Sequence, residues 1–385
     1  MPEQIGTEFD DVIEGTEADD VLKGLGGNDT IFGRGGSDEI FGGDGDDILI
    51  GGPGNDTLDG GEGTDFAVYV NEDAGVTVDL VAGVATKGLE SDTLRSIENV
   101  IGSNYDDMLS GTAGDNVLSG RGGNDIVDGG EGSDRVFGGD GEDLLYGGGG
   151  DDVLGGGDGA DQLRGGDGAD LLLGDGGDDA LYGENGDDTL IGGAGADRFM
   201  IGIDSGNDTI LDFDSSDEIV FDEALGIESM RDLTITDTSE GALVSWGDGS
   251  DSLLFADVSA AELSPFDFGL RPPIPDNVPE GVGPPSNPGG GGGRPSRAAA
   301  ETETELESEG SDATLQNVFR SIEQSAEMDA LIDHYSTDTR VAPSLTNGAI
   351  DNSSILEVQI SYQSTAFGVP LESGIEQMAV DSQAL

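Results

Sequence analysis

A single apolar residue recurs every nine positions along two stretches of the chain, residues 6–68 and 102–200. Each unit opens on glycine, carries aspartate at its sixth position and an apolar residue at its eighth, as in GGDGEDLLY, GGGGDDVLG and GGDGADLLL. The second stretch keeps this register for eleven units and the first for seven, with Asn116 as a departure at the sixth position. A strict short period predicts a repeat architecture, in which stacked units bury their apolar residues together.

Each unit has the composition of one turn followed by one short strand. Its glycine-rich half can adopt positive φ and turn tightly, whereas its polar-apolar-polar half fits a strand with one inward side chain. Because such a strand buries almost nothing alone, we expect two units to form a flattened coil and successive coils to stack as parallel strands. The predicted fold class is therefore all-β, a parallel β-roll in two blocks. The expected inward residues are Ile13, Leu22, Ile31, Ile40, Leu49, Leu58, Ala67, Leu109, Leu118, Val127, Val136, Leu145, Leu154, Leu163, Leu172, Leu181, Leu190 and Phe199.

The sixth-position aspartates are the candidate metal ligands. Alternate units fall on the same edge of the stack, so neighbouring carboxylates would lie about 4.8 Å apart, which is one strand spacing. Carboxylates at that distance repel by roughly 3–4 kcal/mol at an effective dielectric near 20, and Ca²⁺, a hard cation with oxygen ligands, would offset the repulsion. Zinc and softer metals fit poorly, because the chain has no cysteine and one histidine. The predicted Ca²⁺ ligands are Asp11, Asp20, Asp29, Asp38, Asp47, Asp56, Asp65, Asp107, Asp125, Asp134, Asp143, Asp152, Asp161, Asp170, Asp179, Asp188 and Asp197.

The pattern G-G-x-G-x-D-x-U-x, in which U is apolar, is itself a known calcium-binding nonapeptide. On these units the chain resembles the RTX, or haemolysin-type calcium-binding repeat, family, over about half of its length. The resemblance implies a parallel β-roll with multiple Ca²⁺ ions held between turns. It also implies secretion from a Gram-negative bacterium through a one-step, type I exporter that recognises an uncleaved C-terminal signal.

Changes in this pattern divide the chain into six segments. The first two units, GTEFDDVIE and GTEADDVLK, lack the fourth-position glycine, so we expect them to bind calcium poorly and to cap the first array. The segments are a first repeat array at 1–68, a β spacer at 69–101, a second array at 102–200, a β cap at 201–270, a linker at 271–312 and a C-terminal segment at 313–385.

The segments outside the arrays carry weaker patterns. Within the spacer, apolar runs at 76–80 and 93–101 predict strands that either continue the stack or form a hairpin on its side. Proline, glycine and acidic residues predict a disordered linker, whereas 313–335 has helical spacing, and the C-terminal segment is expected to be a secretion signal or a docking element. The strands predicted for the cap, which would cover the open end of the stack, are 219–221, 233–235, 242–246 and 253–255.

The net charge and the hydropathy pattern limit the classes of binding partner and the cellular locations that we expect for the protein. The chain has 82 acidic and 14 basic residues, a net charge of −68, which argues against nucleic acid and against anionic membrane surfaces. No apolar run of 18 residues predicts a membrane span. Because Met1 to Gln4 lead directly into the repeats, we expect no N-terminal secretory signal. With the family resemblance, this predicts an extracellular protein whose export partner is a type I secretion exporter.

Candidate catalytic groups are few. The single histidine, His334, and the lack of cysteine exclude H-E-x-x-H metalloprotease and Cys–His sites, no acidic pair is singled out for glycoside hydrolysis, and Trp246 is expected in the core of the cap. We interpret the chain as a non-enzymatic calcium-binding protein that folds on extracellular Ca²⁺, because a thin, glycine-rich core makes metal binding and folding one event. Two alternatives stay open. One is an adhesive or matrix protein that binds a cell-surface or polysaccharide partner through 313–385, and the other is a calcium-binding accessory module of a secreted hydrolase or epimerase.

Overall fold

The structure, a computed structural model, describes residues 2–270. All of the described residues lie in one compact unit. The predictions for the linker, for the helix at 313–335, for His334 and for the C-terminal segment lie outside the described residues.

The described residues form β-strands and one short 3₁₀ helix, η1 (Glu223–Leu225). The strands are β1 (Glu3–Ile5), β2 (Val12–Glu14), β3 (Val21–Gly26), β4 (Thr30–Phe32), β5 (Glu39–Asp44), β6 (Ile48–Ile50), β7 (Thr57–Glu62), β8 (Phe66–Val68), β9 (Val76–Asp79), β10 (Val84–Lys87), β11 (Glu90–Arg95), β12 (Asn99–Ile101), β13 (Met108–Ser110), β14 (Val117–Gly122), β15 (Ile126–Glu131), β16 (Arg135–Asp140), β17 (Leu144–Gly149), β18 (Val153–Asp158), β19 (Gln162–Asp167), β20 (Leu171–Gly176), β21 (Ala180–Asn185), β22 (Thr189–Ile191), β23 (Arg198–Ile201), β24 (Asn207–Ile210), β25 (Glu218–Phe221), β26 (Leu233–Asp237), β27 (Gly241–Trp246) and β28 (Ser252–Ala256).

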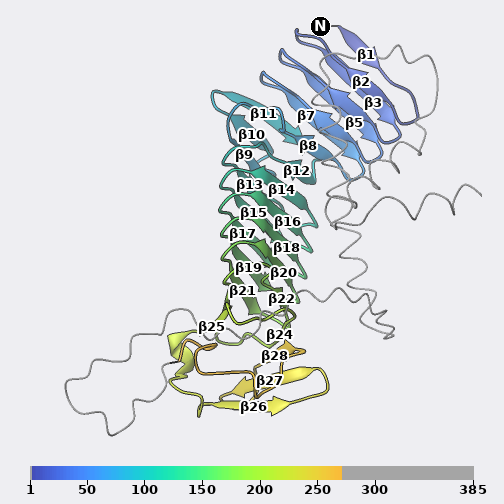
Figure 1. The fold of residues 1–385 in the computed structure, drawn as a ribbon. Coiled ribbons are helices and arrows are strands. Elements are labelled where there is room, and N and C mark those ends of the chain that lie inside the picture. The colour runs from blue at the N-terminus through green and yellow to red at the C-terminus, as the bar shows by residue number, and fades with distance from the viewer. Residues whose placement is uncertain (1, 271–385) are drawn as a thin grey trace, which may run out of the picture. The chain divides into compact units, whose positions relative to one another are not determined.

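These strands make two sheets of 14 strands each, which face one another across the core (Figure 1). In the arrays, odd-numbered strands lie in one sheet, wall A, and even-numbered strands in the other, wall B. Array neighbours within a wall are parallel, as β15 is with β17 in wall A and β16 with β18 in wall B. The chain therefore crosses to the opposite wall after every nine-residue unit, which confirms the predicted parallel β-roll.

The register within a wall has a period of two units. Val127 pairs with Leu145, and Leu145 with Leu163, so each residue lies beside its counterpart 18 positions along the chain. Two units thus complete one coil, as the sequence predicts. Every sixth-position residue and every eighth-position residue is brought into line with its equivalents in the same wall.

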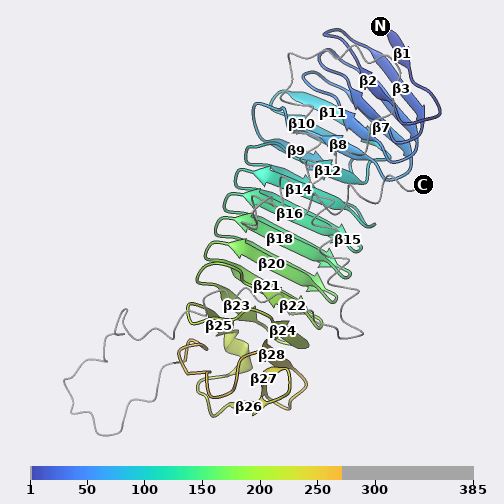
Figure 2. The same cartoon turned by 45° about the vertical axis from the view of Figure 1, so that its right-hand side comes forward.

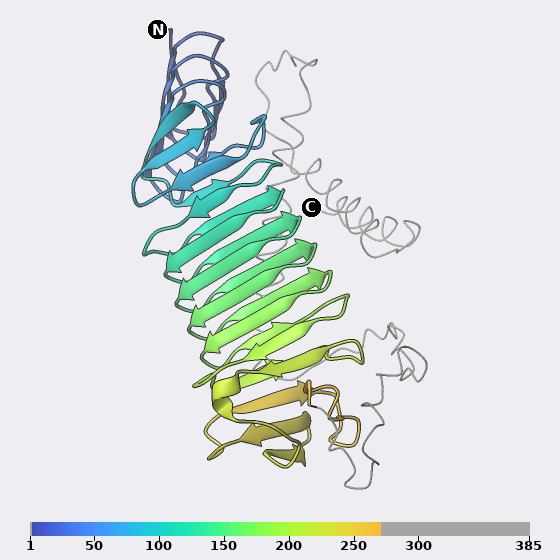
Figure 3. The ribbon, with the colours of Figure 1, turned by 90° about the vertical axis from the view of Figure 1, so that its left-hand side faces the viewer.

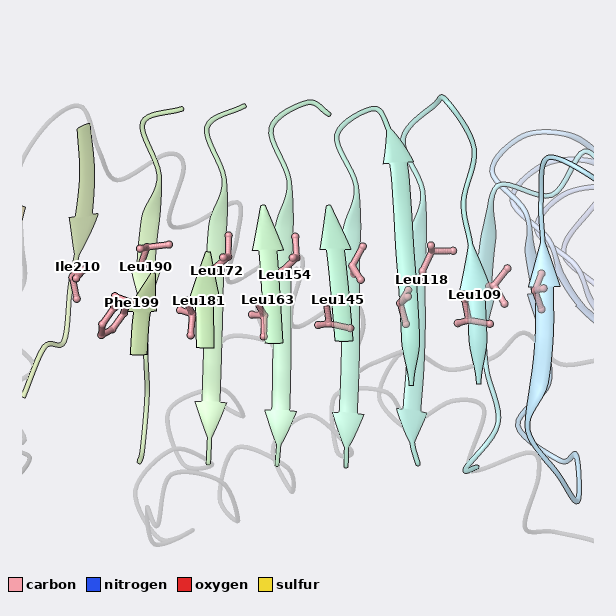
Figure 4. Packing of buried hydrophobic residues seen from close by; sticks show 14 of the residues in the cluster. Leu109, Leu118, Leu145, Leu154, Leu163, Leu172, Leu181, Leu190, Phe199 and Ile210 are labelled. Atoms are coloured by element: carbon pink, nitrogen blue, oxygen red, sulfur yellow. The ribbon is translucent and has the colours of Figure 1, made fainter. Parts of the chain in front are cut away.

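The eighth-position residues form the core between the walls. Leu145, Leu154, Leu163 and Leu172 are fully buried, and Figure 4 shows such side chains of the two walls in the interior of the stack. All the expected inward residues are buried and belong to one continuous cluster, Ala67 included. Since burying one aliphatic side chain stabilises a fold by only about 1.5–3 kcal/mol, a strand with a single core residue contributes little beyond its hydrogen bonds.

Glycines at the second and fourth positions shape the turns. In one mid-array unit, Gly148 and Gly150 have φ of +112° and +127°, where a side chain is disfavoured. A Cβ on Gly150 would also overlap the carbonyl oxygen of Gly132, the equivalent residue one coil earlier. The turns stack closely because nothing projects from the fourth position.

We expect Gly150→Ala to destabilise the fold by at least about 2 kcal/mol, because it combines a strained φ with a backbone overlap. Gly202→Ala is the matched control, since a Cβ at Gly202 meets nothing within 4 Å and its φ is not in the left-handed region. Thermal unfolding in saturating calcium compares the two variants. Equal melting temperatures would contradict the close stacking of the turns.

Residues 69–101 belong to both walls (Figure 2). In wall A, β11 is parallel to β7, β10 is antiparallel to both β11 and β9, and β9 is parallel to β13. In wall B, β12 alone joins β8 to β14. Of the two alternatives that the sequence leaves open, the structure shows the one in which the spacer continues the stack.

The segment 201–270 extends the two walls beyond the second array (Figure 3). Its four predicted strands are observed as β25, β26, β27 and β28, and β28 is parallel to β24 but antiparallel to β27. Aromatic side chains fill this end of the core: the rings of Trp246 and Phe221 are 5.2 Å apart edge to face, and those of Phe213 and Phe255 4.9 Å apart. Trp246 is 6% exposed, as expected for a core residue.

Candidate metal centre

The sixth-position aspartates lie at the point where each turn becomes a strand. Asp152, for example, precedes β18 and is followed two residues later by the core residue Leu154. Because Leu154 must point inward, the side chain two residues before it lies on the same face of the chain. Of the predicted ligands, all except Asp11 are buried.

Apart from Asp11 and Asp20, which begin the first array, each of these carboxylates has one oxygen that accepts a hydrogen bond from a backbone N–H of the preceding coil. The Asp134 backbone N–H donates to Asp152 Oδ1 (2.7 Å), and the Asp152 N–H donates to Asp170 Oδ1 (2.9 Å). The spacer divides these ladders into four runs, two on each wall. The runs are Asp11-Asp29-Asp47-Asp65-Glu98 and Asn116-Asp134-Asp152-Asp170-Asp188-Asp208 on wall B, and Asp20-Asp38-Asp56-Asp92 and Asp107-Asp125-Asp143-Asp161-Asp179-Asp197-Asp217 on wall A.

The predicted ligands all fall in these four runs, so the structure brings them together as stacked carboxylates. Four further acidic residues, which the sequence analysis did not include, extend the runs. Each of the three aspartates among them begins an Asp-x-apolar triplet like Asp56-Thr57-Leu58, and that signal could have identified them without the nine-residue register. The additional residues are Asp92, Glu98, Asp208 and Asp217.

The second oxygen of most of these carboxylates is buried without a hydrogen-bond partner among the described residues. At Gly147, the first residue of the unit that holds Asp152, a Cβ would meet both Asp152 Oδ2 and the Gly165 carbonyl oxygen of the next coil. A carboxylate oxygen and a turn carbonyl therefore face the same place. The buried atoms without a hydrogen-bond partner are Oδ1 of Asp20 and Oδ2 of Asp29, Asp38, Asp47, Asp56, Asp65, Asp92, Asp125, Asp134, Asp143, Asp152, Asp161, Asp170, Asp179 and Asp188.

Burial raises the pKa of these carboxyls. For Asp152 and Asp170 the pKa rises to about 7, chiefly because burial disfavours the charged form and further because neighbouring carboxylates repel it. Backbone N–H groups lower these pKa values but do not offset the burial. Burying an ionised carboxylate with one unpaired oxygen costs free energy. A cation next to these oxygens would reduce that cost.

The donor set fits calcium. Buried carboxylate oxygens and turn carbonyls are the hard oxygen ligands that Ca²⁺ takes, and neighbouring coils supply them at every step of a column. Within residues 2–270, no group of three or more histidine, aspartate or glutamate side chains is assembled into a metal cluster. A cation in these columns would accordingly share single carboxylates from adjacent coils and complete its shell with backbone carbonyls.

At the start of each array, a hydroxyl residue at the second position of the unit donates hydrogen bonds to the sixth-position side chain. Thr7 donates both its N–H (2.5 Å) and its hydroxyl (2.8 Å) to Asp11 Oδ2, and Thr16 does the same to Asp20 Oδ2. Asp20 Oδ1 nevertheless stays buried without a hydrogen-bond partner, so the poor calcium binding expected of the first two units stays a prediction. At the start of the second array, Ser103 donates its N–H to Asp107 Oδ2 and its hydroxyl to Asp107 Oδ1, and Thr112 donates both its N–H and its hydroxyl to Asn116 Oδ1. A hydroxyl residue at the second position marks all four units, and this repetition could have been recognised in the sequence.

Asp152→Asn is expected to raise the calcium midpoint of folding several-fold more than Asp11→Asn. Asn keeps the acceptor of the ladder but removes the charge, and Asp152 lies mid-run with an unpartnered Oδ2, whereas Thr7 already satisfies Asp11. The measurement is a calcium titration followed by far-ultraviolet circular dichroism. Equal midpoint shifts in the two variants would contradict the assignment of mid-run carboxylates as the cation-binding groups.

Comparison with known proteins agrees with this geometry. The family profile described as RTX calcium-binding nonapeptide repeat (4 copies) matches in five segments: residues 5–40, 33–67, 101–136, 128–163 and 164–199. A search of curated protein sequences found no match.

Among solved structures, the chain is similar to the extracellular lipase LipA from Serratia marcescens, with 16% identity and a TM-score of 0.21. The match covers 70% of this chain but 40% of the lipase chain.

In the part of the chain that the structure describes, no helix is long and apolar enough to cross a membrane. The profile match and the stacked, aspartate-bearing turns lead to one assignment: the two arrays, matched over residues 5–67 and 101–199, are RTX calcium-binding nonapeptide repeats.

Proposed function

We propose that this chain is a secreted, non-enzymatic calcium-binding protein whose β-roll orders when Ca²⁺ fills its carboxylate columns. The observation that carries the proposal is the series of buried Oδ2 atoms without a partner, repeated from Asp29 to Asp188 along both walls. Solubility alone would place carboxylates on the outside, where water satisfies them.

The chain's own groups would hold the ion between coils. In the middle of the second array, Asp134, Asp152 and Asp170 would each contribute Oδ2, and turn carbonyls such as that of Gly165 would complete the shell. Bound calcium supplies the positive charge that stacked carboxylates lack. The backbone N–H groups that hold each Oδ1 keep the other oxygen aimed at the ion, so the ladder orients the ligands.

On this proposal, the β-roll folds only after the chain has left the cell. Calcium binding and folding are coupled when no preformed site exists in the unfolded chain, and a chain of net charge −68 stays extended where calcium is scarce. Export through a type I exporter, which the family resemblance implies, would then deliver an unfolded chain to a calcium-rich medium. The matched repeats and the buried carboxylate oxygens without a partner support this sequence of events.

Equilibrium dialysis against calcium tests the proposal. We expect several ions per molecule for the wild-type chain and fewer for a variant with Asp134→Asn, Asp152→Asn and Asp170→Asn. As the matched control, Asp10→Asn, Asp19→Asn and Asp46→Asn alter exposed fifth-position carboxylates and should leave the number of ions unchanged. No binding at millimolar calcium, or equal loss in the two triple variants, would refute it.

A further inference from the structure

One buried lysine lies inside a carboxylate run at the junction of the two arrays. Lys87, the last residue of β10, is 6% exposed, and its Nζ is 3.1 Å from Asp92 Oδ2 and 3.6 Å from Asp56 Oδ2. Asp56 and Asp92 are consecutive members of one run, because the Asp56 N–H donates to Asp92 Oδ1 (2.9 Å). The lysine ammonium therefore lies between the carboxylates of neighbouring coils.

The same ammonium contacts a turn carbonyl. Lys87 donates to the backbone oxygen of Gly52, which belongs to the unit that holds Asp56, and it also pairs with Glu72 Oε1 at 3.5 Å. The contacts with the two aspartates are ion pairs and not well-aligned hydrogen bonds. Two carboxylate oxygens from adjacent coils plus a turn carbonyl are the kinds of donor that mid-array columns offer to a cation.

We propose that Lys87 is a built-in cation that takes the place of a calcium ion between Asp56 and Asp92. The junction of the arrays, which is the spacer 69–101 with the strands that it pairs with, then stays folded when calcium is absent. When calcium binds, both arrays fold outward from this folded junction. This inference rests on the proposed calcium-binding function, since only a calcium-dependent column needs a substitute ion. An ammonium carried by the chain is present at every calcium concentration, and lysine is a compact point charge suited to a monovalent replacement.

The core at the junction supports the same conclusion independently. The spacer, 69–101, places seven apolar side chains from 33 residues in the continuous cluster, whereas the second array, 102–200, places eleven from 99 residues. This greater apolar burial stabilises the junction without any ion. The buried residues of the spacer in that cluster are Tyr69, Val76, Val78, Ala85, Leu94, Ile97 and Val100.

Hydrogen exchange of the full chain in EDTA at neutral pH tests the proposal directly. We expect amides of β7, β11 and β12 to exchange at least about ten-fold more slowly than those of β15 to β20 when calcium is absent. Adding calcium should then protect the arrays as well. In Lys87→Met, which keeps the length of the side chain but not its charge, the junction should lose this protection in EDTA and regain it with calcium.

Native mass spectrometry provides a second readout that does not depend on stability. Lys87→Met should bind one calcium ion more than the wild-type chain, because the vacated position between Asp56 and Asp92 becomes a calcium site. Lys23→Met is the matched control, since Lys23 pairs with Glu3 on the exposed surface and its loss should change neither exchange at the junction nor the number of ions.

The outcomes separate this inference from the proposed function. Junction amides that exchange in EDTA as fast as array amides would overturn the role of Lys87, while array amides that respond to calcium would still support the proposed function. Arrays indifferent to calcium would overturn the proposed function itself. If Lys87→Met did not fold even with calcium, the wild-type exchange pattern would decide. An unchanged exchange pattern and an unchanged ion count in Lys87→Met would also refute the inference.

Discussion

Removing calcium at neutral pH is expected to abolish the β-structure of both arrays. Each mid-array strand contributes one core side chain, whereas each coil brings a buried carboxylate within one strand spacing of the next. Without a cation, mutual repulsion and the desolvation of these charges outweigh the small apolar contribution of each strand. Far-ultraviolet circular dichroism should show a largely disordered chain in EDTA and a β spectrum in millimolar calcium.

Magnesium is the control for this prediction. It demands tight octahedral geometry and retains its waters, so it should restore the β spectrum poorly at concentrations where calcium restores it fully. High sodium chloride should also fail, because salt screens exposed charges far better than buried ones. A complete β spectrum in EDTA at pH 7.5 would show that the columns do not need an ion.

Mild acid is expected to restore part of the fold in the absence of calcium. Burial raises the pKa of carboxyls such as Asp125, Asp152 and Asp179 to about 7, from an ordinary value of 3.8. Between these values the folded, calcium-free chain binds more protons than the unfolded chain, so its stability falls as pH rises through the window. The stabilisation is complete below the unfolded pKa, near 4, and is lost as pH passes 7.

The measurement is a pH series in EDTA from pH 8 to pH 5.5, which stays above the isoelectric point of about 4.1. The β signal should grow as pH falls and should disappear when the sample is returned to pH 8. Calcium affinity should change in the opposite sense, since protonation removes the charge that binds the ion. A calcium-free signal that is constant across the series, or strongest at pH 8, would contradict the buried state of these carboxyls.

The fold of the arrays could be predicted because their information is local and repeated. Any single unit, such as the one from Gly147 to Gly155, contains the glycines that turn, the aspartate that precedes the strand and the leucine that faces inward. Each unit stacks on units with the same pattern. The register of 18 residues, and the alignment of the aspartates along each wall, therefore follow from the nine-residue period. The inward residues and the alignment of the aspartates were accordingly expected in full, and the structure shows both.

The junction could not be predicted in the same way, because its pairing is not local. Thr93 pairs with Thr57, 36 residues earlier, and the meander of β9, β10 and β11 enters wall A opposite a single strand of wall B. The apolar runs of the spacer indicate strands but not their partners. Register between segments without a repeat depends on which side chains can be buried together, and that is settled only when the whole stack is assembled.

For individual carboxylates, too, one part of the chemistry follows from the sequence and another part only from the folded structure. The sequence by itself determined that aspartates would line each wall, because their spacing equals that of the strands. Only the tertiary structure decided which carboxylate oxygen accepts from each backbone N–H, and which carboxylates accept from Thr7 and Ser103. It also decided that Lys87, on another strand, forms ion pairs with Asp56 and Asp92. The reason is physical: spacing along the chain sets where a charge lies, whereas its partner is whichever donor the folded neighbours bring within about 3 Å.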